Sequence, residues 1–311
     1  MTVEQPGTGV RMSLHDDVRR LVEGFSIEVV PREARRIDDF QRHLPSGTRV
    51  FVAWIPGARP RDVADTAVKL REHGMVPVPH LPARNIDGKR TLRNLLGQLA
   101  GEAEVDEALV IGGDSSRQAG PFASSLDLLQ TGLLEDHGIR RVGIAGHPEG
   151  HPSVGESMMR QALRAKAAYA AANEVEMRIV TQFAFSARPI LRWLERTKAT
   201  NAPGLAVEVG LPGLTTARNL MRFARSCGVG GSLGVLFRHA GTAFRLASVV
   251  TPQRTILDLA RPAAERPDHG IETIHLYPFG GFKRTAGWAR ALAEGRFRLR
   301  EDGRKLEVQP E

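Results

Sequence analysis

Short apolar segments alternate with longer amphipathic segments along most of this chain, and this alternation limits the fold more than any other feature. The short segments are rich in Val, Ile, Leu and Phe, as strands are, whereas the longer ones carry apolar residues at helical three- and four-residue spacing. Strands that alternate with helices form parallel sheets, because each helix carries the chain back to the start of the next strand. The predicted strands are Ser26–Pro31, Arg49–Ile55, Val76–Leu81, Ala108–Asp114, Arg141–Gly146, Met177–Phe183, Leu205–Leu211 and Thr273–Phe279.

Eight such strand–helix units in a chain of 311 residues are typical of a single α/β domain, the (β/α)8 TIM barrel. The gap between Leu211 and Thr273 is longer than the others, so we expect extra helical elements between strands 7 and 8. We expect an N-terminal extension with a helix at 1–24, the barrel at 25–300 and a C-terminal tail at 301–311. The predicted helices are Pro60–His73, Leu92–Leu99, Leu126–His137, Glu156–Asn173, Pro189–Thr197 and Thr215–Arg225.

Charge and cysteine content narrow the classes of partner. The formal net charge is +8, but no block of five or six basic residues occurs and aromatic residues make up only 5% of the chain. Nucleic-acid binding is therefore not expected, whereas a phosphate-bearing cofactor or a carboxylate-bearing substrate suits the charge. The single cysteine, Cys227, excludes an internal disulfide and a cysteine-based zinc cluster. No apolar run reaches the roughly 20 residues of a membrane span, so we expect no membrane association and a cytoplasmic protein.

Active sites in this fold lie at the carboxyl ends of the strands, where the loops converge. Glu28 lies in the first predicted strand, and alternation places its side chain on the same face as Ser26 and Val30. A carboxylate among apolar neighbours is costly when charged, so its pKa should be raised toward that of a general acid. The alternative interpretation is a strand-end glutamate that pairs with Arg32.

Asp114 follows two glycines at the end of the fourth predicted strand. Gly112 and Gly113 allow the backbone to approach a flat ligand closely, and the aspartate beyond them could orient that ligand. The alternative is a cap of a helix or turn, assisted by Ser115 and Ser116.

His147 and His151 flank the segment His-Pro-Glu-Gly-His after the fifth predicted strand. Metal-binding pairs at this spacing usually lie on one helical face, which Pro148 and Pro152 disfavour. No third ligand is evident, so we expect no metal and interpret both histidines as hydrogen-bond partners of a phosphate, a ribose or a ring.

Two further strand ends carry groups suited to a ligand. Gln182 precedes Phe183, and its amide can match the donor–acceptor edge of a heterocycle, although a structural bond to the backbone is equally consistent. The last strand carries His275 and Tyr277, which core packing also explains. No G-x-G-x-x-G motif follows a predicted strand, so a dinucleotide would bind here without a Rossmann unit.

Six of these strand-end segments resemble those of the methylenetetrahydrofolate reductase family, flavin-dependent TIM-barrel enzymes of one-carbon metabolism. The resemblance runs from about Phe25 to Trp288. The matching segments are Ser26-Ile-Glu-Val-Val-Pro31, Val78-Pro-His-Leu81, Gly112-Gly-Asp114 followed by Phe122-Ala-Ser124, Gly146-His-Pro-Glu-Gly-His-Pro152, Thr181-Gln-Phe183 and Ile274-His-Leu-Tyr277.

The resemblance implies an FAD-dependent oxidoreductase that interconverts 5,10-methylenetetrahydrofolate and 5-methyltetrahydrofolate by hydride transfer through flavin N5. It assigns Glu28 as the general acid that helps to open the five-membered ring to an iminium, Asp114 as a residue near the flavin and pterin, and Gln182 as a substrate contact with Phe183 beside it. It also implies a homo-oligomer and NADH or NADPH as electron donor. The residues placed around FAD are Trp54, His80, Gly112, Gly113, Asp114, Phe122, Ala123, His147, His151 and Lys166.

The chain also departs from the family pattern. The turn before Thr181 is replaced by Ala171-Ala-Asn-Glu-Val-Glu176, with inserted residues, which changes the expected contacts to the FAD phosphates and adenine. Lys283 or Arg284 takes the place of an arginine that binds substrate. No aromatic residue follows Pro212 to stack on nicotinamide or folate, so an oxidoreductase without direct NAD(P)H oxidation is the main alternative. A noncatalytic folate- or flavin-binding barrel is another.

Overall fold

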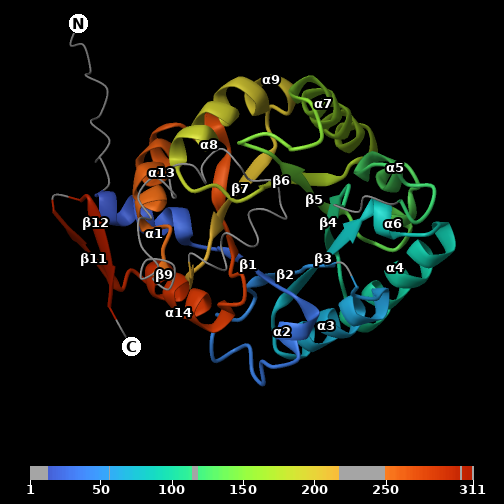
Figure 1. The fold of residues 1–311 in the computed structure, drawn as a ribbon, viewed down its shortest axis with the longest axis horizontal. Coiled ribbons are helices and arrows are strands. Elements are labelled where there is room, and N and C mark those ends of the chain that lie inside the picture. The colour runs from blue at the N-terminus through green and yellow to red at the C-terminus, as the bar shows by residue number, and fades with distance from the viewer. Residues whose placement is uncertain (1–12, 56, 114–117, 217–248, 302, 310–311) are drawn as a thin grey trace, which may run out of the picture.

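The computed structural model describes residues 13–55, 57–113, 118–216, 249–301 and 303–309. Eight strands close into a barrel in the order β1-β10-β7-β6-β5-β4-β3-β2, and every neighbouring pair is parallel. Helices surround the strands (Figure 1). The predicted (β/α)8 fold is confirmed. The barrel strands are β1 (Ser26–Val29), β2 (Arg49–Val52), β3 (Val76–Pro82), β4 (Glu107–Ile111), β5 (Arg141–Gly146), β6 (Glu176–Thr181), β7 (Ala206–Pro212) and β10 (Ile271–Tyr277).

Each helix predicted before β7 is present, although the bounds differ in detail. The segment predicted as one helix from Leu126 to His137 is divided at Gly132, which has a φ of 71°. The helix predicted at Pro189–Thr197 begins at Ala187 and changes to a π-helix over Leu194–Lys198. The described helices up to this point are α1 (Leu14–Val22), α2 (Pro31–Ala34), α3 (Pro60–Glu72), α4 (Lys89–Ala103), α5 (Ser125–Leu129), α6 (Leu133–Asp136), α7 (Glu156–Asn173), α8 (Ala187–Trp193) and α9 (Ala199–Asn201).

The segment between β7 and β10 contains additional elements, as predicted. These are the strand pair β8 (Thr215–Thr216) and β9 (Val249–Val250), the helix α13 (Gln253–Glu265) and a 3-10 helix (Pro267–His269). The helix predicted at Thr215–Arg225 begins instead with β8, and the rest of it lies outside the described residues.

Both ends of the described chain pack on the same side of the barrel. α1 packs against α13 and α14 (Phe282–Ala293). The residues of the expected C-terminal tail include β12 (Lys305–Val308), which pairs antiparallel with β11 (Phe297–Arg300), so a hairpin crosses the expected boundary at residue 300. This hairpin lies outside the ring of helices (Figure 1).

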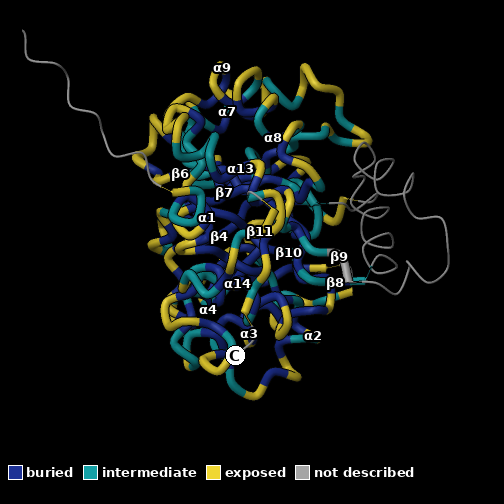
Figure 2. The backbone as a smooth tube through the Cα atoms, turned by 90° about the vertical axis from the view of Figure 1, so that its left-hand side faces the viewer, coloured by how far each residue is buried: buried dark blue, intermediate teal, exposed yellow. Residues whose placement is uncertain are grey.

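Alternation along the strands divides the core into two parts, as β2 illustrates. Val50 and Val52 face outward into the layer between sheet and helices, whereas Phe51 faces inward and packs with Val78 and Leu109. Figure 2 shows the buried backbone in the centre and the exposed segments at the periphery.

A cluster of charged side chains fills the inside of the barrel near the amino ends of the strands. Arg49 on β2 pairs with Glu208 on β7 and lies 3.6 Å from Glu107 on β4, measured from Nη1 to Oε1. Arg178 on β6 lies 3.5 Å from a carboxylate oxygen of Glu107 and 3.3 Å from one of Glu208. Because these strands are not all neighbours, the side chains meet across the barrel interior. Glu107 and Glu208 are fully buried, so the two arginines compensate charges that would otherwise be very costly there.

Glycines are required where strands and loops approach closely. An added Cβ at Gly210 in β7 would overlap the carbonyl oxygen of Thr181 and lie 2.9 Å from Cε2 of Tyr277, whereas one at Gly97 in α4 would meet nothing within 4 Å. We therefore expect Gly210→Ala to lower the free energy of unfolding by about 1–3 kcal/mol. Gly97→Ala should raise it by about 0.5–1 kcal/mol, because alanine costs less conformational entropy in a helix. Urea denaturation of both variants measures the two effects, and shifts of the same sign would contradict this account.

No helix among the described residues is long and apolar enough to cross a membrane.

Candidate active site

Glu28 projects from β1 toward His80 on β3 at the mouth of the barrel. The distance from Oε2 of Glu28 to Nε2 of His80 is 3.6 Å, and the two side chains are 18% and 10% exposed. Arg32, the alternative partner, is exposed and makes no ion pair with Glu28. The carboxyl group therefore faces the barrel interior beside a histidine.

Burial controls the protonation of this pair. It raises the pKa of Glu28 to about 8, with a smaller contribution from the negative charge of Glu33. It lowers the pKa of His80 to about 3, with a smaller contribution from His275. At neutral pH the imidazole is therefore uncharged and the carboxyl group holds its proton. This is the protonation state that a general acid requires.

His275 lies below the mouth and belongs to the barrel interior. Its Nδ1 is 2.8 Å from Oγ of Ser26, and that hydroxyl donates to Glu208 at 2.6 Å. Since the hydroxyl proton goes to Glu208, neutral His275 must donate from Nδ1, which leaves Nε2 as an acceptor. The ring packs against Phe51 and Tyr277, with centroid distances of 4.5 and 4.6 Å. His275 thus links the mouth to the buried charged cluster.

Gly112 and Gly113 follow β4 and provide backbone at the mouth without side chains. Gly113 has a φ of 85°, and a Cβ there would lie 3.1 Å from Cβ of Pro82. A Cβ at Gly112 would meet nothing within 4 Å, so a ligand can approach this backbone. Asp114 lies outside the described residues, and its expected role stays a prediction.

Gln182 and Phe183 follow β6 and face different surroundings. Gln182 is half-buried, and its Oε1 accepts a hydrogen bond from the backbone N–H of Phe183 at 3.0 Å. Phe183 is 1% exposed and packs against Phe185, Tyr277 and Phe279. Phe183 is therefore a packing residue, whereas the Gln182 amide nitrogen stays available to a ligand.

Three expected cofactor residues support the loops of the mouth. The indole N–H of Trp54 donates to the carbonyl oxygen of Ala58 at 3.0 Å, and Phe122 is 4% exposed. Ala123 is exposed, and its carbonyl oxygen accepts a bond from Nε of Arg84. These residues shape the loops rather than offer polar side-chain groups.

Lys283 and Arg284 are exposed in the first turn of α14, the helix that follows β10. The backbone N–H of the preceding residue, Phe282, donates to Oε1 of Glu33 at 3.3 Å. The positive charge of Lys283 contributes to lowering the pKa of His43, after burial.

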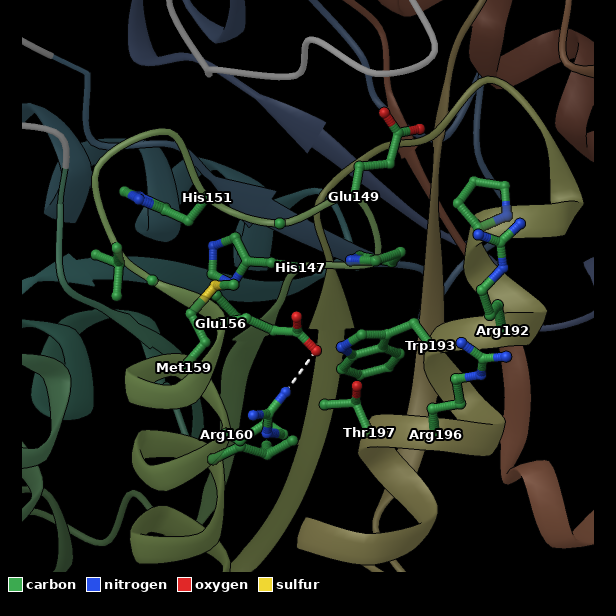
Figure 3. A pocket seen from close by; sticks show the side chains of 18 residues that line it. His147, Glu149, His151, Glu156, Met159, Arg160, Arg192, Trp193, Arg196 and Thr197 are labelled. Atoms are coloured by element: carbon green, nitrogen blue, oxygen red, sulfur yellow. Dashed lines mark hydrogen bonds and ion pairs between the residues drawn. The ribbon is translucent and has the colours of Figure 1, made fainter.

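A cavity of about 530 Å³ lies beside the carboxyl end of β5, between α7 and α8 (Figure 3). His147 and His151 both line it, and their rings meet edge to face with centroids 5.3 Å apart. Burial lowers the pKa of His147 to about 4, with smaller contributions from His151 and Lys166. Lys166 on α7 is 8% exposed, and burial lowers the pKa of its ammonium group to about 8.

The cavity also contains residues that sequence reasoning missed. Arg160 comes from α7, Arg192 and Trp193 come from α8, and Arg196 comes from the following π-helix. The available signal was an Arg-Trp-Leu-Glu-Arg segment, but such a pattern is also typical of a solvated helix face. Among the described residues, no group of three or more His, Cys, Asp or Glu side chains is arranged to hold a metal ion.

No family model matches the sequence. The fold is similar to that of an uncharacterized protein from Clostridium thermocellum that binds two copies of 5-methyl-5,6,7,8-tetrahydrofolic acid. The TM-score is 0.58 and the identity 10%, over 90% of this chain and 97% of that chain. This likeness supports the barrel fold. An actinorhodin polyketide ketoreductase variant with NADPH matches with a TM-score of only 0.27 and 14% identity, over 83% of this chain and 97% of that chain, which is too low to indicate a shared fold.

Proposed function

We propose that this protein is a flavin-dependent oxidoreductase that interconverts 5,10-methylenetetrahydrofolate and 5-methyltetrahydrofolate. The observation that carries the proposal is the largely buried carboxyl group of Glu28 at the mouth of the barrel, 3.6 Å from His80, where burial raises its pKa to about 8. Two further findings support it. The fold is similar to that of a protein that binds 5-methyltetrahydrofolate, and the strand-end segments resemble those of methylenetetrahydrofolate reductases.

The residues at the mouth suit a flat, polar cofactor such as FAD. His80 Nε2 is buried and has no hydrogen-bond partner among the described residues, so a ligand group could satisfy it. The backbone at Gly112 is open to a ring, while His147 and His151 line the adjoining cavity. When bound, FAD would supply the hydride chemistry.

The chain itself would supply orientation and a proton. In the direction of reduction, Glu28 would give the proton on its carboxyl oxygen to the substrate nitrogen released when the five-membered ring opens. In the reverse direction the same carboxylate would take that proton back. Neutral His80 adds no positive charge beside Glu28, so the raised pKa of Glu28 is preserved. Gln182 would direct its amide nitrogen at the pterin edge.

A second candidate keeps flavin and folate but excludes direct oxidation of NADH or NADPH. The supporting observation is Gly213, which follows Pro212 where the family has a stacking aromatic residue. An added Cβ at Gly213 would lie 2.5 Å from Oγ1 of Thr285, so this position cannot carry a ring without rearrangement. The flavin would then exchange its two electrons with another electron carrier, such as a redox protein, both when methylenetetrahydrofolate is reduced and when methyltetrahydrofolate is oxidised.

The test is anaerobic titration of purified, FAD-loaded protein, followed by its visible spectrum. We expect bound flavin to lose the visible absorbance of its oxidised form when 5-methyltetrahydrofolate is added, because the flavin takes up the hydride. Separate additions of NADH and NADPH distinguish the two candidate functions. Only an enzyme that oxidises NADH or NADPH directly should lose its flavin absorbance when a nicotinamide is added. A protein that binds 5-methyltetrahydrofolate but never retains flavin would instead be a noncatalytic folate-binding barrel.

A further inference from the structure

Two arginines of the cavity between α7 and α8 have no ionic partner among the described residues. Arg192 and Arg196 are exposed, one helical turn apart, and line the cavity. By contrast, Arg160 on the opposite wall pairs with Glu156, as the dashed line in Figure 3 shows. Long, charged side chains that line a concave site without a counter-ion are suited to an anionic ligand.

The opposite wall adds backbone donors. α7 begins at Glu156, and its N-cap residue Gly155 has no side chain that could accept from the first-turn amides. The first N–H group bonded within the helix is that of Met159, which donates to Gly155. The amides before it, together with the helix dipole, favour negative charge at this end of α7. The cavity therefore has anion-binding groups on both sides.

His151 contributes a directed donor. Its Nδ1 accepts the backbone N–H of Ser153 at 3.1 Å, so the neutral ring carries its proton on Nε2. That N–H is suited to a phosphate or ribose oxygen. His151 lines the cavity together with His147.

Trp193 provides an aromatic surface beside these donors. It is 9% exposed and lines the cavity, and its six-membered ring packs under the end of β5. A Cβ at Gly146 would lie 3.0 Å from Cη2 of this ring and 2.7 Å from Cγ2 of Ile179, so glycine is needed to seat the indole there. In Figure 3, Arg192 and Arg196 lie on one side of Trp193 and Arg160 lies on the other. An aromatic ring flanked by cations matches a ligand that joins a planar base to phosphates.

We propose that this cavity binds a nucleoside diphosphate group, with Arg192 and Arg196 as the phosphate ligands and Trp193 as the wall against the base. A cavity of about 530 Å³ lies within the roughly 300–1,000 Å³ typical of small-ligand sites. The group could be a free nucleotide or the ADP half of FAD. β4 and β5 are neighbouring strands, so one dinucleotide can reach from Gly112 at the mouth to this cavity. The assignment to FAD rests on the proposed function, whereas the nucleotide site itself does not.

The test is isothermal titration calorimetry of the full chain with ADP, inorganic phosphate, FMN and FAD. We expect ADP to bind, and the variant Arg192→Gln/Arg196→Gln to weaken ADP binding by about 10–100-fold, because both proposed phosphate ligands lose their charge. FAD affinity should fall similarly, whereas FMN, which lacks the adenylate, should bind equally to both proteins. Arg188→Gln is the matched control, because Arg188 is exposed on the same helix but does not line the cavity.

The outcomes separate this inference from the proposed function. ADP binding that depends on Arg192 and Arg196, in a protein that retains no flavin, would support the nucleotide site and contradict the flavin enzyme. FAD and FMN binding with equal affinity, unaffected by the double variant and without ADP binding, would overturn the nucleotide site and leave the flavin enzyme intact. Equal losses for Arg188→Gln and the double variant would show only a general effect of charge and would also overturn the site.

Discussion

Glu28→Gln is expected to reduce folate turnover by about 10²–10⁴-fold, the usual contribution of a general acid, while leaving FAD affinity unchanged. The substitution keeps the size of the side chain and removes the proton that Glu28 holds at neutral pH. Flavin binding should persist because Glu28 is proposed to act on the folate substrate and not to bind the flavin. Stopped-flow reduction and reoxidation of bound flavin measure turnover, and quenching of flavin fluorescence measures affinity. The matched control is Glu23→Gln, an exposed carboxylate before β1 that lies outside the proposed site.

The pH dependence gives the same assignment a second test. The protonated form of Glu28 is lost as pH rises through about 8, so reduction of methylenetetrahydrofolate by the wild type should decline above that pH. The residual rate of Glu28→Gln should not show this decline.

The stability of the protein should depend on the same group. The pKa of Glu28 rises from 4.5 to about 8 on folding, so the folded state binds more protons between these two pH values. Stability contributed by protonated Glu28 is present below pH 4.5 and is lost as pH rises through about 8, so the variant should lose less stability there. Identical pH profiles for wild type and variant would rule out Glu28 as the acid.

Glu208→Ala should lower the free energy of unfolding by about 3–5 kcal/mol, because it leaves buried positive charge without its partner. Glu208 is fully buried and accepts from Ser26, Arg49 and Arg178. After its removal, Glu107 would be the remaining buried carboxylate near the two arginines. Urea denaturation, followed by circular dichroism, measures the change.

Glu272→Ala is the control for this prediction, since Glu272 pairs with the same Arg178 at 3.2 Å but is 51% exposed. A pair on the surface gains little, so the expected loss is below about 1 kcal/mol. Equal losses for the two variants would mean that the charged cluster does not stabilise the barrel interior.

Much of the fold could be predicted because periodicity reports burial directly. Alternating Arg49-Val-Phe-Val predicts a strand with one face toward each part of the core, and the structure confirms both faces. The helix expected at Leu126–His137 failed in detail, because Gly132 in the left-handed region interrupts it. Helical periodicity continues across that break, so hydrophobic spacing alone could not locate it.

The candidate site was predictable only in part. Glu28 was identified from its place in a strand that ends at the mouth and His80 from the family resemblance, but their proximity of 3.6 Å is a property of the closed barrel. Phe183 looked like a ligand contact in sequence, yet it packs among other aromatic rings. Whether a side chain at a strand end faces a ligand or the core depends on how the neighbouring strands and helices pack around it.

The order of strands and helices, the closed barrel and a carboxyl group placed where its pKa would rise could all be predicted from the amino-acid sequence. Three-dimensional packing sets His80, rather than Arg32, beside that carboxyl group and brings Arg49, Glu107, Arg178 and Glu208 together inside the barrel. It also placed Arg192 and Arg196 in one cavity with His147 and His151. The reason is that periodicity records local contacts, whereas these groups lie far apart in the chain. Closure of the barrel and packing of α7 and α8 bring them together.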